Sequence, residues 1–180
     1  MSSVPANVLV PGLGNDILSD DAVGLWVAQA VRSRLAGAAG IDVKEATAME
    51  LALLDETSGH ASVVLVNSAQ MRRAPPERIH QLGPGRLAGI RSASPHFLGV
   101  EETLAAGELL GLAMPRQVCI FALEVADAFT LGAGLTPTVA AAVPATAEQI
   151  VKRARELARR PPPVAAPAEL ISTGRRARFD

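Results

Sequence analysis

Residues 12–24 join two segments whose apolar residues recur with different periods, and they read Gly12-Leu13-Gly14-Asn15-Asp16-Ile17-Leu18-Ser19-Asp20-Asp21-Ala22-Val23-Gly24. The segment before them, 7–10, is a short apolar run typical of a buried strand. After them, apolar residues follow helical spacing at Val23, Val27, Ala30, Val31 and Leu35. The pattern predicts a strand closed by Pro11 and Gly12, a turn, and a helix from Asp20 to the glycines at 37 and 40.

The rest of the chain continues to alternate between strand-like and helix-like segments. Further strands are predicted at 42–46, 62–67, 78–82 and 117–123, of which 78–82 reads as an edge strand. Helices are predicted at 49–54, from Ser94-Pro95 onward, and from Thr136-Pro137 onward. The helix that begins at Ser94-Pro95 should direct four apolar side chains toward the core: Phe97, Val100, Leu104 and Leu109. Pro144 should kink or split the last helix.

This alternation predicts the fold class, an α/β three-layer αβα sandwich around a mainly parallel, twisted sheet of about five strands, of the phosphorylase/hydrolase-like type. The length of 180 residues fits one domain, which we place at 1–160. Three consecutive prolines at 161–163 end the last helix. The segment 161–180 is rich in Pro and Ala and predicts a disordered tail.

Composition excludes several classes of function. Seventeen basic residues against eighteen acidic ones give a net charge of −1, and no basic stripe with interleaved aromatics suggests nucleic-acid binding. The amino terminus lacks the features of a signal peptide, and no apolar run approaches the roughly 20 residues that span a bilayer. We therefore expect a cytoplasmic protein without a membrane partner, a monomer or a weak dimer. Cys119, the only cysteine, lies in an apolar strand and is expected to be buried and inert.

A nucleotide site is the first alternative for the glycine turn. The dinucleotide-binding fingerprint needs a third glycine where this chain has Ile17, and acids at the helix start would repel a pyrophosphate. A phosphate-binding P-loop would need Gly-Lys-Ser/Thr, which is absent from the turn. The turn therefore disfavours phosphate.

Sites in parallel sheets form at the carboxyl ends of strands. Three acids, Asp16, Asp20 and Asp21, lie within six residues after the first strand and suit a cation. The structural alternative is that Asp20 caps the helix, Asp21 favours its dipole and Asp16 is solvated. His96 follows Ser94-Pro95 at a predicted helix start, where a neutral imidazole able to bind a metal is favoured, although a surface histidine is the simpler interpretation.

Several motifs together resemble one family. Gly12-x-Gly14-Asn15, followed after four residues by Asp20-Asp21-x-Val23-Gly24, is similar to the signature of the nickel–iron hydrogenase maturation endopeptidases. The same family resemblance continues, in order, through three later segments: the apolar strand that ends at Asn67, then Ser94-Pro95-His96 with Leu98-Gly99, then Gly134-Leu135-Thr136-Pro137-Thr138-Val139. Together they span residues 7–158.

The resemblance implies a function and a site. Members of this family remove a C-terminal extension from the large-subunit precursor of a nickel–iron hydrogenase after nickel insertion. The implied metal ligands and catalytic residues are Asp21, Asn67 and His96, and the implied cofactor is nickel carried by the precursor. Asp20 is expected to hold the turn. Gly12 is a supporting residue of the turn. The backbone amides of Gly14 and Asn15 are candidates to orient the substrate backbone or to stabilise an oxyanion.

Asn67 departs from the family pattern, which has an aspartate at this position. An amide oxygen coordinates without bringing a negative charge, and an amide cannot act as a general base near neutral pH. Two acids are candidates to substitute for the lost carboxylate, Asp16 and Glu45. The alternatives are a degenerate relative that binds the precursor as a chaperone or checkpoint without cleaving it, and a binding domain or enzyme of another class on the same sheet.

Overall fold

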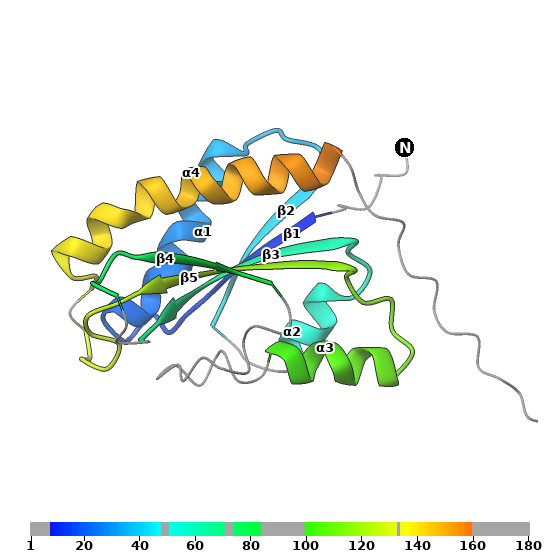
Figure 1. Cartoon of the computed structure of the whole chain (residues 1–180), viewed down its shortest axis with the longest axis horizontal. Helices are drawn as coiled ribbons and strands as arrows, with labels where there is room; N and C mark the ends of the chain where they lie inside the picture. Colours follow the sequence, from blue (N-terminus) through cyan, green and yellow to red (C-terminus); the bar gives the residue numbers. More distant parts are fainter. Residues whose placement is uncertain (1–7, 48–50, 71–73, 84–99, 133, 160–180) are drawn as a thin grey trace, which may run out of the picture.

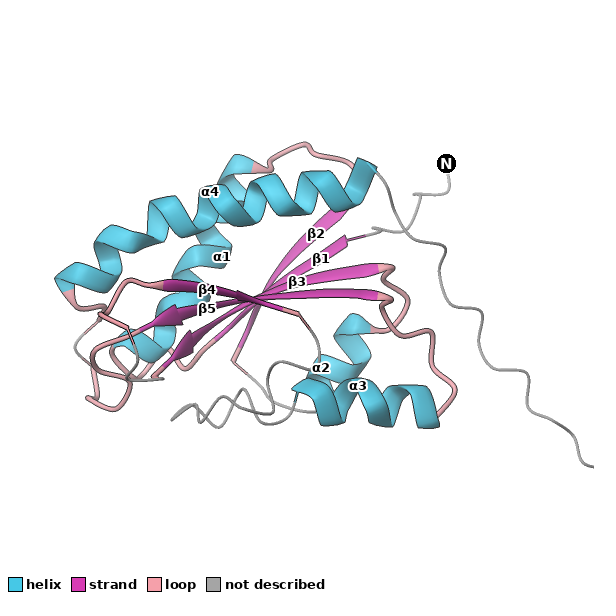
Figure 2. Cartoon of the chain, viewed as in Figure 1, coloured by secondary structure: helices cyan, strands magenta, loops and turns pink. Residues whose placement is uncertain are grey.

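The computed structural model describes residues 8–47, 51–70, 74–83, 100–132 and 134–159. The strands are β1 (Val8–Leu13), β2 (Ile41–Ala46), β3 (Ser62–Ala69), β4 (Ile79–Leu82) and β5 (Gln117–Glu124). The helices are the 3₁₀ turn η1 (Asp20–Ala22), α1 (Val23–Arg34), α2 (Leu51–Thr57), α3 (Val100–Leu109) and α4 (Pro137–Arg159) (Figure 2). The helix start predicted at Ser94-Pro95 and the tail 161–180 lie outside the described residues.

The five strands form one sheet in the order β2-β1-β3-β5-β4. Strands β2, β1, β3 and β5 are parallel, and β4 pairs antiparallel with β5 at one edge. Helices α1 and α4 cover one face of the sheet, and α2 and α3 cover the other (Figure 1). The predicted three-layer architecture is confirmed.

Alternation along the strands divides the core into two clusters. Val64 and Val66 of β3 belong to the cluster under α1 and α4, which we call the α1/α4 face. Leu65 and Ala69 belong to the cluster with Leu53 of α2 and Val100 of α3, which we call the α2/α3 face. Because successive side chains of a strand point to opposite faces, this division fixes the face of every polar residue in β3 and β5.

Two glycines allow α1 to lie directly on β1. A Cβ on Gly24 would lie 1.9 Å from the carbonyl oxygen of Leu13, and a Cβ on Gly12 would lie 2.2 Å from the carbonyl oxygen of Gly24. Real side chains do not approach backbone atoms this closely. The glycines of the signature motif therefore set the distance between α1 and β1. They thereby also set how far the acidic turn before α1 lies from the sheet.

Most predicted elements are confirmed, with differences that have physical causes. Strand β1 runs through Pro11 and Gly12 to Leu13, because β2 and β3 flank it and its pairing with β2 is uninterrupted. Helix α4 is one helix that contains Pro144, so the predicted split is wrong. The inward orientation predicted for Leu109 is also wrong. This residue ends α3 and is 89 % exposed, whereas Val100 is buried as expected.

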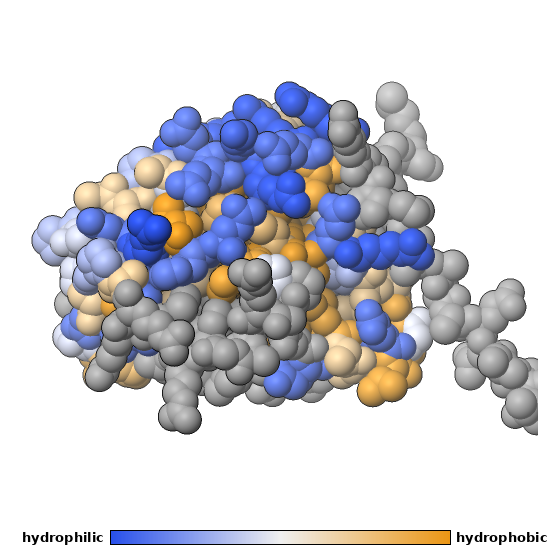
Figure 3. Space-filling model, viewed as in Figure 1, coloured by the Kyte–Doolittle hydropathy of each residue, from blue (hydrophilic) through white to orange (hydrophobic). Residues whose placement is uncertain are grey.

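The surface is polar over α4 and apolar near the end of α3. Figure 3 shows hydrophilic residues along the outer side of α4 and an apolar area where Figure 1 places the end of α3. The exposed apolar residues of that region are Leu109, Leu110 and Leu112. No helix within the described ranges has the length and hydropathy to cross a bilayer.

Candidate functional site

The carboxylate of Asp20 joins three segments of the chain. Its Oδ2 accepts hydrogen bonds from the backbone N–H groups of Ala126 (3.2 Å) and Asp127 (3.0 Å), which follow β5. Its Oδ1 accepts the backbone N–H of Thr136 at 2.7 Å, and the Thr136 hydroxyl donates to Oδ2 at 3.1 Å. Asp20 is fully buried, so these four donors replace the water that the carboxylate has lost. We call this arrangement the Asp20 clamp.

Neighbouring contacts strengthen the same junction. The Ser19 hydroxyl donates to the carbonyl of Gly134 at 2.6 Å, and the Ser19 N–H donates to the carbonyl of Thr130 at 2.8 Å. Leu18 and Leu131 form an isolated antiparallel bridge. The expectation that Asp20 holds the turn therefore agrees with its contacts, and the turn is tied as well to the loop between β5 and α4.

Asp21, the first predicted metal ligand, lies at the carboxyl end of β3. Its Oδ1 accepts a 2.5 Å hydrogen bond from the hydroxyl of Ser68. From its place in the turn, Asp21 is expected at the surface and away from the core. That expectation is wrong, because Asp21 is only 3 % exposed. The cause is the tight turn before it, where a Cβ on Gly14 would lie 2.3 Å from the carbonyl oxygen of Asp21.

Asn67, the second predicted ligand, precedes Ser68 and is fully buried. Its Oδ1 accepts the backbone N–H of Ser68 at 2.8 Å, and within the described residues its Nδ2 has no hydrogen-bond partner. By strand alternation Ser68 belongs to the α1/α4 face, where it meets Asp21, whereas Asn67 belongs to the α2/α3 face. The structure thus brings Asp21 beside the neighbour of Asn67. The third predicted ligand, His96, lies outside the described residues.

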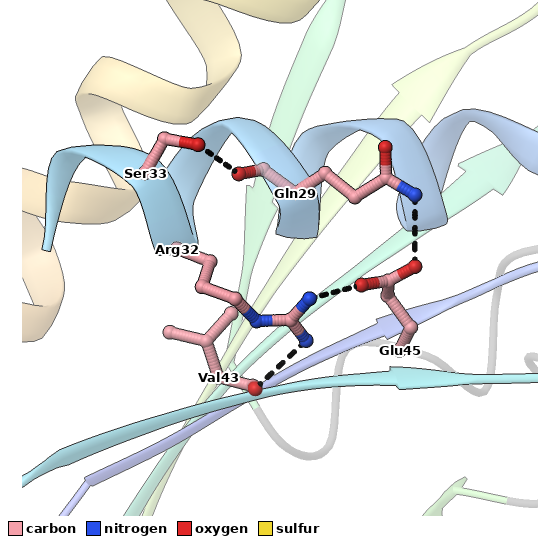
Figure 4. Close-up of polar contacts among 5 residues, drawn as sticks. All are labelled: Gln29, Arg32, Ser33, Val43 and Glu45. Atoms are coloured by element: carbon pink, nitrogen blue, oxygen red, sulfur yellow. Dashed lines mark hydrogen bonds and ion pairs between the residues drawn. The ribbon is translucent and has the colours of Figure 1, made fainter. Parts of the chain in front are cut away.

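Glu45, a candidate substitute acid, is engaged elsewhere. Its carboxylate forms an ion pair with Arg32 and accepts a 2.9 Å hydrogen bond from Gln29 (Figure 4). The hydrogen bond from Gln29, followed by the hydrogen bond and charge of Arg32, lowers the pKa of Glu45 below its ordinary value of 4.5, against the opposing effect of burial. Glu45 is level with Gly12 of β1 and Val66 of β3, two strands away from β3, and its carboxylate bonds residues of α1, on the opposite face of the sheet from Asn67.

Asp16, the other candidate substitute, is exposed in the turn. Its exposure matches the solvated acid of the structural alternative. No group of three or more His, Cys, Asp or Glu side chains that could hold a metal ion occurs among the residues described.

The turn residues Gly14 and Asn15 mainly shape the backbone. The N–H of Gly14 donates to the carbonyl of Ala46 at 3.3 Å, so this amide continues the pairing of β1 with β2 and is not available to an oxyanion. The side chain of Asn15 accepts the N–H of Ile17 at 3.1 Å, the hydrogen bond of a tight turn. Gly12 makes room for α1, as described above.

Sequence reasoning missed two of the contacts that build this region. Ser68 lies with Asn67 at a strand end where a site is expected, but a serine there does not by itself indicate a bond to Asp21. The sequence predicts Thr136 as a helix cap. Its hydrogen bond to Asp20, 116 residues earlier, is a tertiary contact that the local sequence does not predict. The shared presence of Asp20-Asp21 and Gly-Leu-Thr-Pro in one family signature was the available hint that these segments meet.

Comparison with known proteins adds to this geometry. No family model matches the chain. The hydrogenase 2 maturation protease of Escherichia coli K12 is 23 % identical over 151 residues, which cover 83 % of this chain and 91 % of that protein. The expected family resemblance is confirmed.

Solved structures of hydrogenase maturation proteases share the fold. The maturating endopeptidase HybD of E. coli has a TM-score of 0.74 at 23 % identity, and the match covers 83 % of this chain and 93 % of HybD. HybD of Thermococcus kodakarensis has a TM-score of 0.66 at 23 % identity, over 84 % of this chain and 99 % of that one. The similarity therefore extends over nearly the full length of these proteases.

Proposed function

We propose that this chain is an endopeptidase that removes the C-terminal extension of a nickel–iron hydrogenase large-subunit precursor after nickel insertion. Its similarity in sequence and fold to hydrogenase maturation proteases supports this function. The observation that carries the proposal is the buried carboxylate of Asp21 at the carboxyl end of β3, adjacent to Ser68 and Asn67. Binding and catalytic sites of parallel sheets form at the carboxyl ends of the strands.

The chemistry follows from the donor atoms. Carboxylate, amide oxygen and imidazole, from Asp21, Asn67 and His96, suit a divalent transition metal that the precursor already holds by other ligands. Nickel enters as part of the substrate and supplies polarisation of a carbonyl or a water. Ser68 orients the Asp21 carboxylate, and Nδ2 of Asn67, which has no hydrogen-bond partner among the described residues, offers a donor to a peptide carbonyl.

A second candidate is a non-cleaving relative that binds the precursor as a checkpoint. The observation in its favour is Asn67 itself, a buried amide where the family pattern has an acid. An amide binds the same ion more weakly than a carboxylate and transfers no proton near neutral pH. Cleavage lowers the mass of the large-subunit precursor, whereas binding as a checkpoint leaves its mass unchanged.

The test is incubation of purified chain with nickel-loaded precursor, followed by mass spectrometry of the large subunit. We expect loss of a C-terminal peptide and a decrease in rate of at least about 100-fold in Asp21→Asn, because the amide removes the charge that meets the ion. Asp42→Asn, a change at the start of β2, is the matched control and should cleave normally. Tight binding without a mass change would favour the checkpoint, and normal cleavage by Asp21→Asn would refute the site.

A further inference from the structure

The α2/α3 face carries a row of aligned residues at the carboxyl end of the sheet. Asn67 of β3 pairs with Ala122 of β5, and Ala122 pairs with His80 of β4. Directly paired residues share a face, so Asn67 and His80 flank Ala122 on the same side of the sheet. Ala122 belongs to the α2/α3 cluster, which fixes that side.

Glu124 points into the same region. It lies two residues beyond Ala122 and pairs with Ala69, which also belongs to the α2/α3 face. Diagonal neighbours on one face of a sheet have Cβ atoms about 7 Å apart, within reach of a Glu side chain from Asn67. The carboxylate of Glu124 lies 3.6 Å from Nε2 of His80, beyond hydrogen-bond distance.

Burial makes this carboxylate informative. Glu124 is 3 % exposed, and inside a protein a carboxylate acts strongly on the polar groups near it, which here include His80. Asn67, fully buried on the same face, presents an Nδ2 without a partner in the described residues. Three adjacent strands therefore direct an amide, a carboxylate and an imidazole to one place. The NH₂ group of the amide donates and cannot bind a cation, so the atom of Asn67 that can face a metal ion is Oδ1, which has a second lone pair beside the one that accepts the Ser68 N–H.

We propose that Glu124 supplies, from the neighbouring strand, the negative charge that Asn67 lacks, so that Asn67 and Glu124 together face the divalent metal ion of the substrate. This inference rests on the proposed function, since it assigns a further residue to the same site. His80 is a positioning residue that orients the carboxylate through their 3.6 Å contact. Glu124 thus replaces Asp16 and Glu45 as the compensating acid.

The experiment moves the negative charge from position 124 on β5 to position 67 on β3. Glu124→Gln should weaken the binding of Ni²⁺ alone, measured by titration calorimetry on the full chain, by about tenfold or more, and should slow precursor cleavage in parallel. Adding Asn67→Asp to Glu124→Gln should restore both to within about threefold of the parent, because a carboxylate then stands on β3 instead of β5. Glu77→Gln, an exposed acid whose backbone bonds to Glu124, is the matched control and should change neither.

Stability and binding separate this role from a structural ion pair. A structural Glu124–His80 pair would make Glu124→Gln and His80→Gln equally destabilising in urea, would leave Ni²⁺ affinity unchanged and would gain nothing from Asn67→Asp. That result would overturn the inference.

The outcomes also distinguish the inference from the proposed function. If the parent chain cleaves and Glu124→Gln cleaves equally well, the inference fails and the function stands. If the parent never cleaves but its Ni²⁺ affinity follows the charge at Glu124 and Asn67, the function fails and the inference stands. If the parent binds no Ni²⁺ alone, the cleavage rates of the single and double variants decide. A parent that neither binds nor cleaves overturns both.

Discussion

Asp20 and Asp21 are consecutive acids with opposite tasks. Asp20 is saturated by four donors from two distant segments, and it serves the fold. Asp21 accepts a hydrogen bond from Ser68 at the end of β3, and the proposed function assigns its carboxylate to the chemistry. Two identical side chains in adjacent positions are thus distinguished by the donors around them and not by any property of the local sequence.

The Asp20 clamp predicts a large effect of a small change. Asp20→Asn should lower the free energy of unfolding by about 3 kcal/mol, because the new NH₂ group faces buried donors that then lack an acceptor. Urea denaturation followed by circular dichroism measures it. Asp16→Asn, in the same turn but exposed, should change stability by less than about 0.5 kcal/mol. Equal stability of the two variants would contradict the clamp.

The contact between Gly24 and β1 predicts intolerance to a single methyl group. In Gly24→Ala the new Cβ would meet the Leu13 carbonyl at 1.9 Å, so α1 must shift away from the sheet. We expect a loss of at least about 3 kcal/mol, or failure to fold, measured by thermal unfolding of purified protein. Gly83→Ala is the matched control, since open space surrounds Gly83. Normal stability of Gly24→Ala would show that α1 does not lie where we describe it.

At the scale of elements, α1 and β2 are joined at the surface by Glu45 and its partners (Figure 4). The lowered pKa of Glu45 means that its contribution is present above the unfolded pKa, near 4.5, and is lost as the pH falls through the lower folded value. Because the pair is exposed, Glu45→Gln should cost less than about 1 kcal/mol at pH 7. The difference from the parent, measured by urea denaturation, should shrink below pH 4.5. A difference that grows in acid would have the wrong sign.

Helix α4 continues through an internal proline. Pro144 has no N–H to donate to the carbonyl of Ala140, yet the helix extends from Pro137 to Arg159. Its inner side holds it to the sheet through Ala147, Ile150, Ala154 and Leu157. Packing against the sheet therefore prevailed over the local preference for a break.

Replacing that proline should stabilise the protein. Pro144 is exposed, so Pro144→Ala removes no core contact, restores one helical hydrogen bond and should raise the free energy of unfolding by about 1–2 kcal/mol. Thermal unfolding measures the change. Ala145→Pro, one residue later on the exposed side, should have the opposite sign. A neutral result for Pro144→Ala would indicate that the helix already relieves the proline by local distortion.

For the whole molecule, the strands and helices could be predicted from the sequence because hydrophobic period is a local signal. The strand 62–67 and the face formed by Val23, Val27 and Val31 needed no tertiary information. The site was harder, because it depends on register. Neither the opposite faces of Asn67 and Ser68 nor the alignment of Glu124 with Ala69 follows from any short stretch of residues. Glu124 follows directly after the strand predicted at 117–123, and His80 lies in the predicted edge strand 78–82, where the sequence assigns it no role.

The clamp also has a consequence for the order in which the protein matures. Its last donors, the amide and hydroxyl of Thr136, belong to a residue that the ribosome adds after the strands β1 to β5 and the helices α1 to α3. Until then the carboxylate of Asp20 has at most the two backbone donors that follow β5, and it stays partly hydrated. A nascent chain therefore completes the clamp only after residue 136 has been added, so a shorter copy lacks the bond that ties the acidic turn to the start of α4.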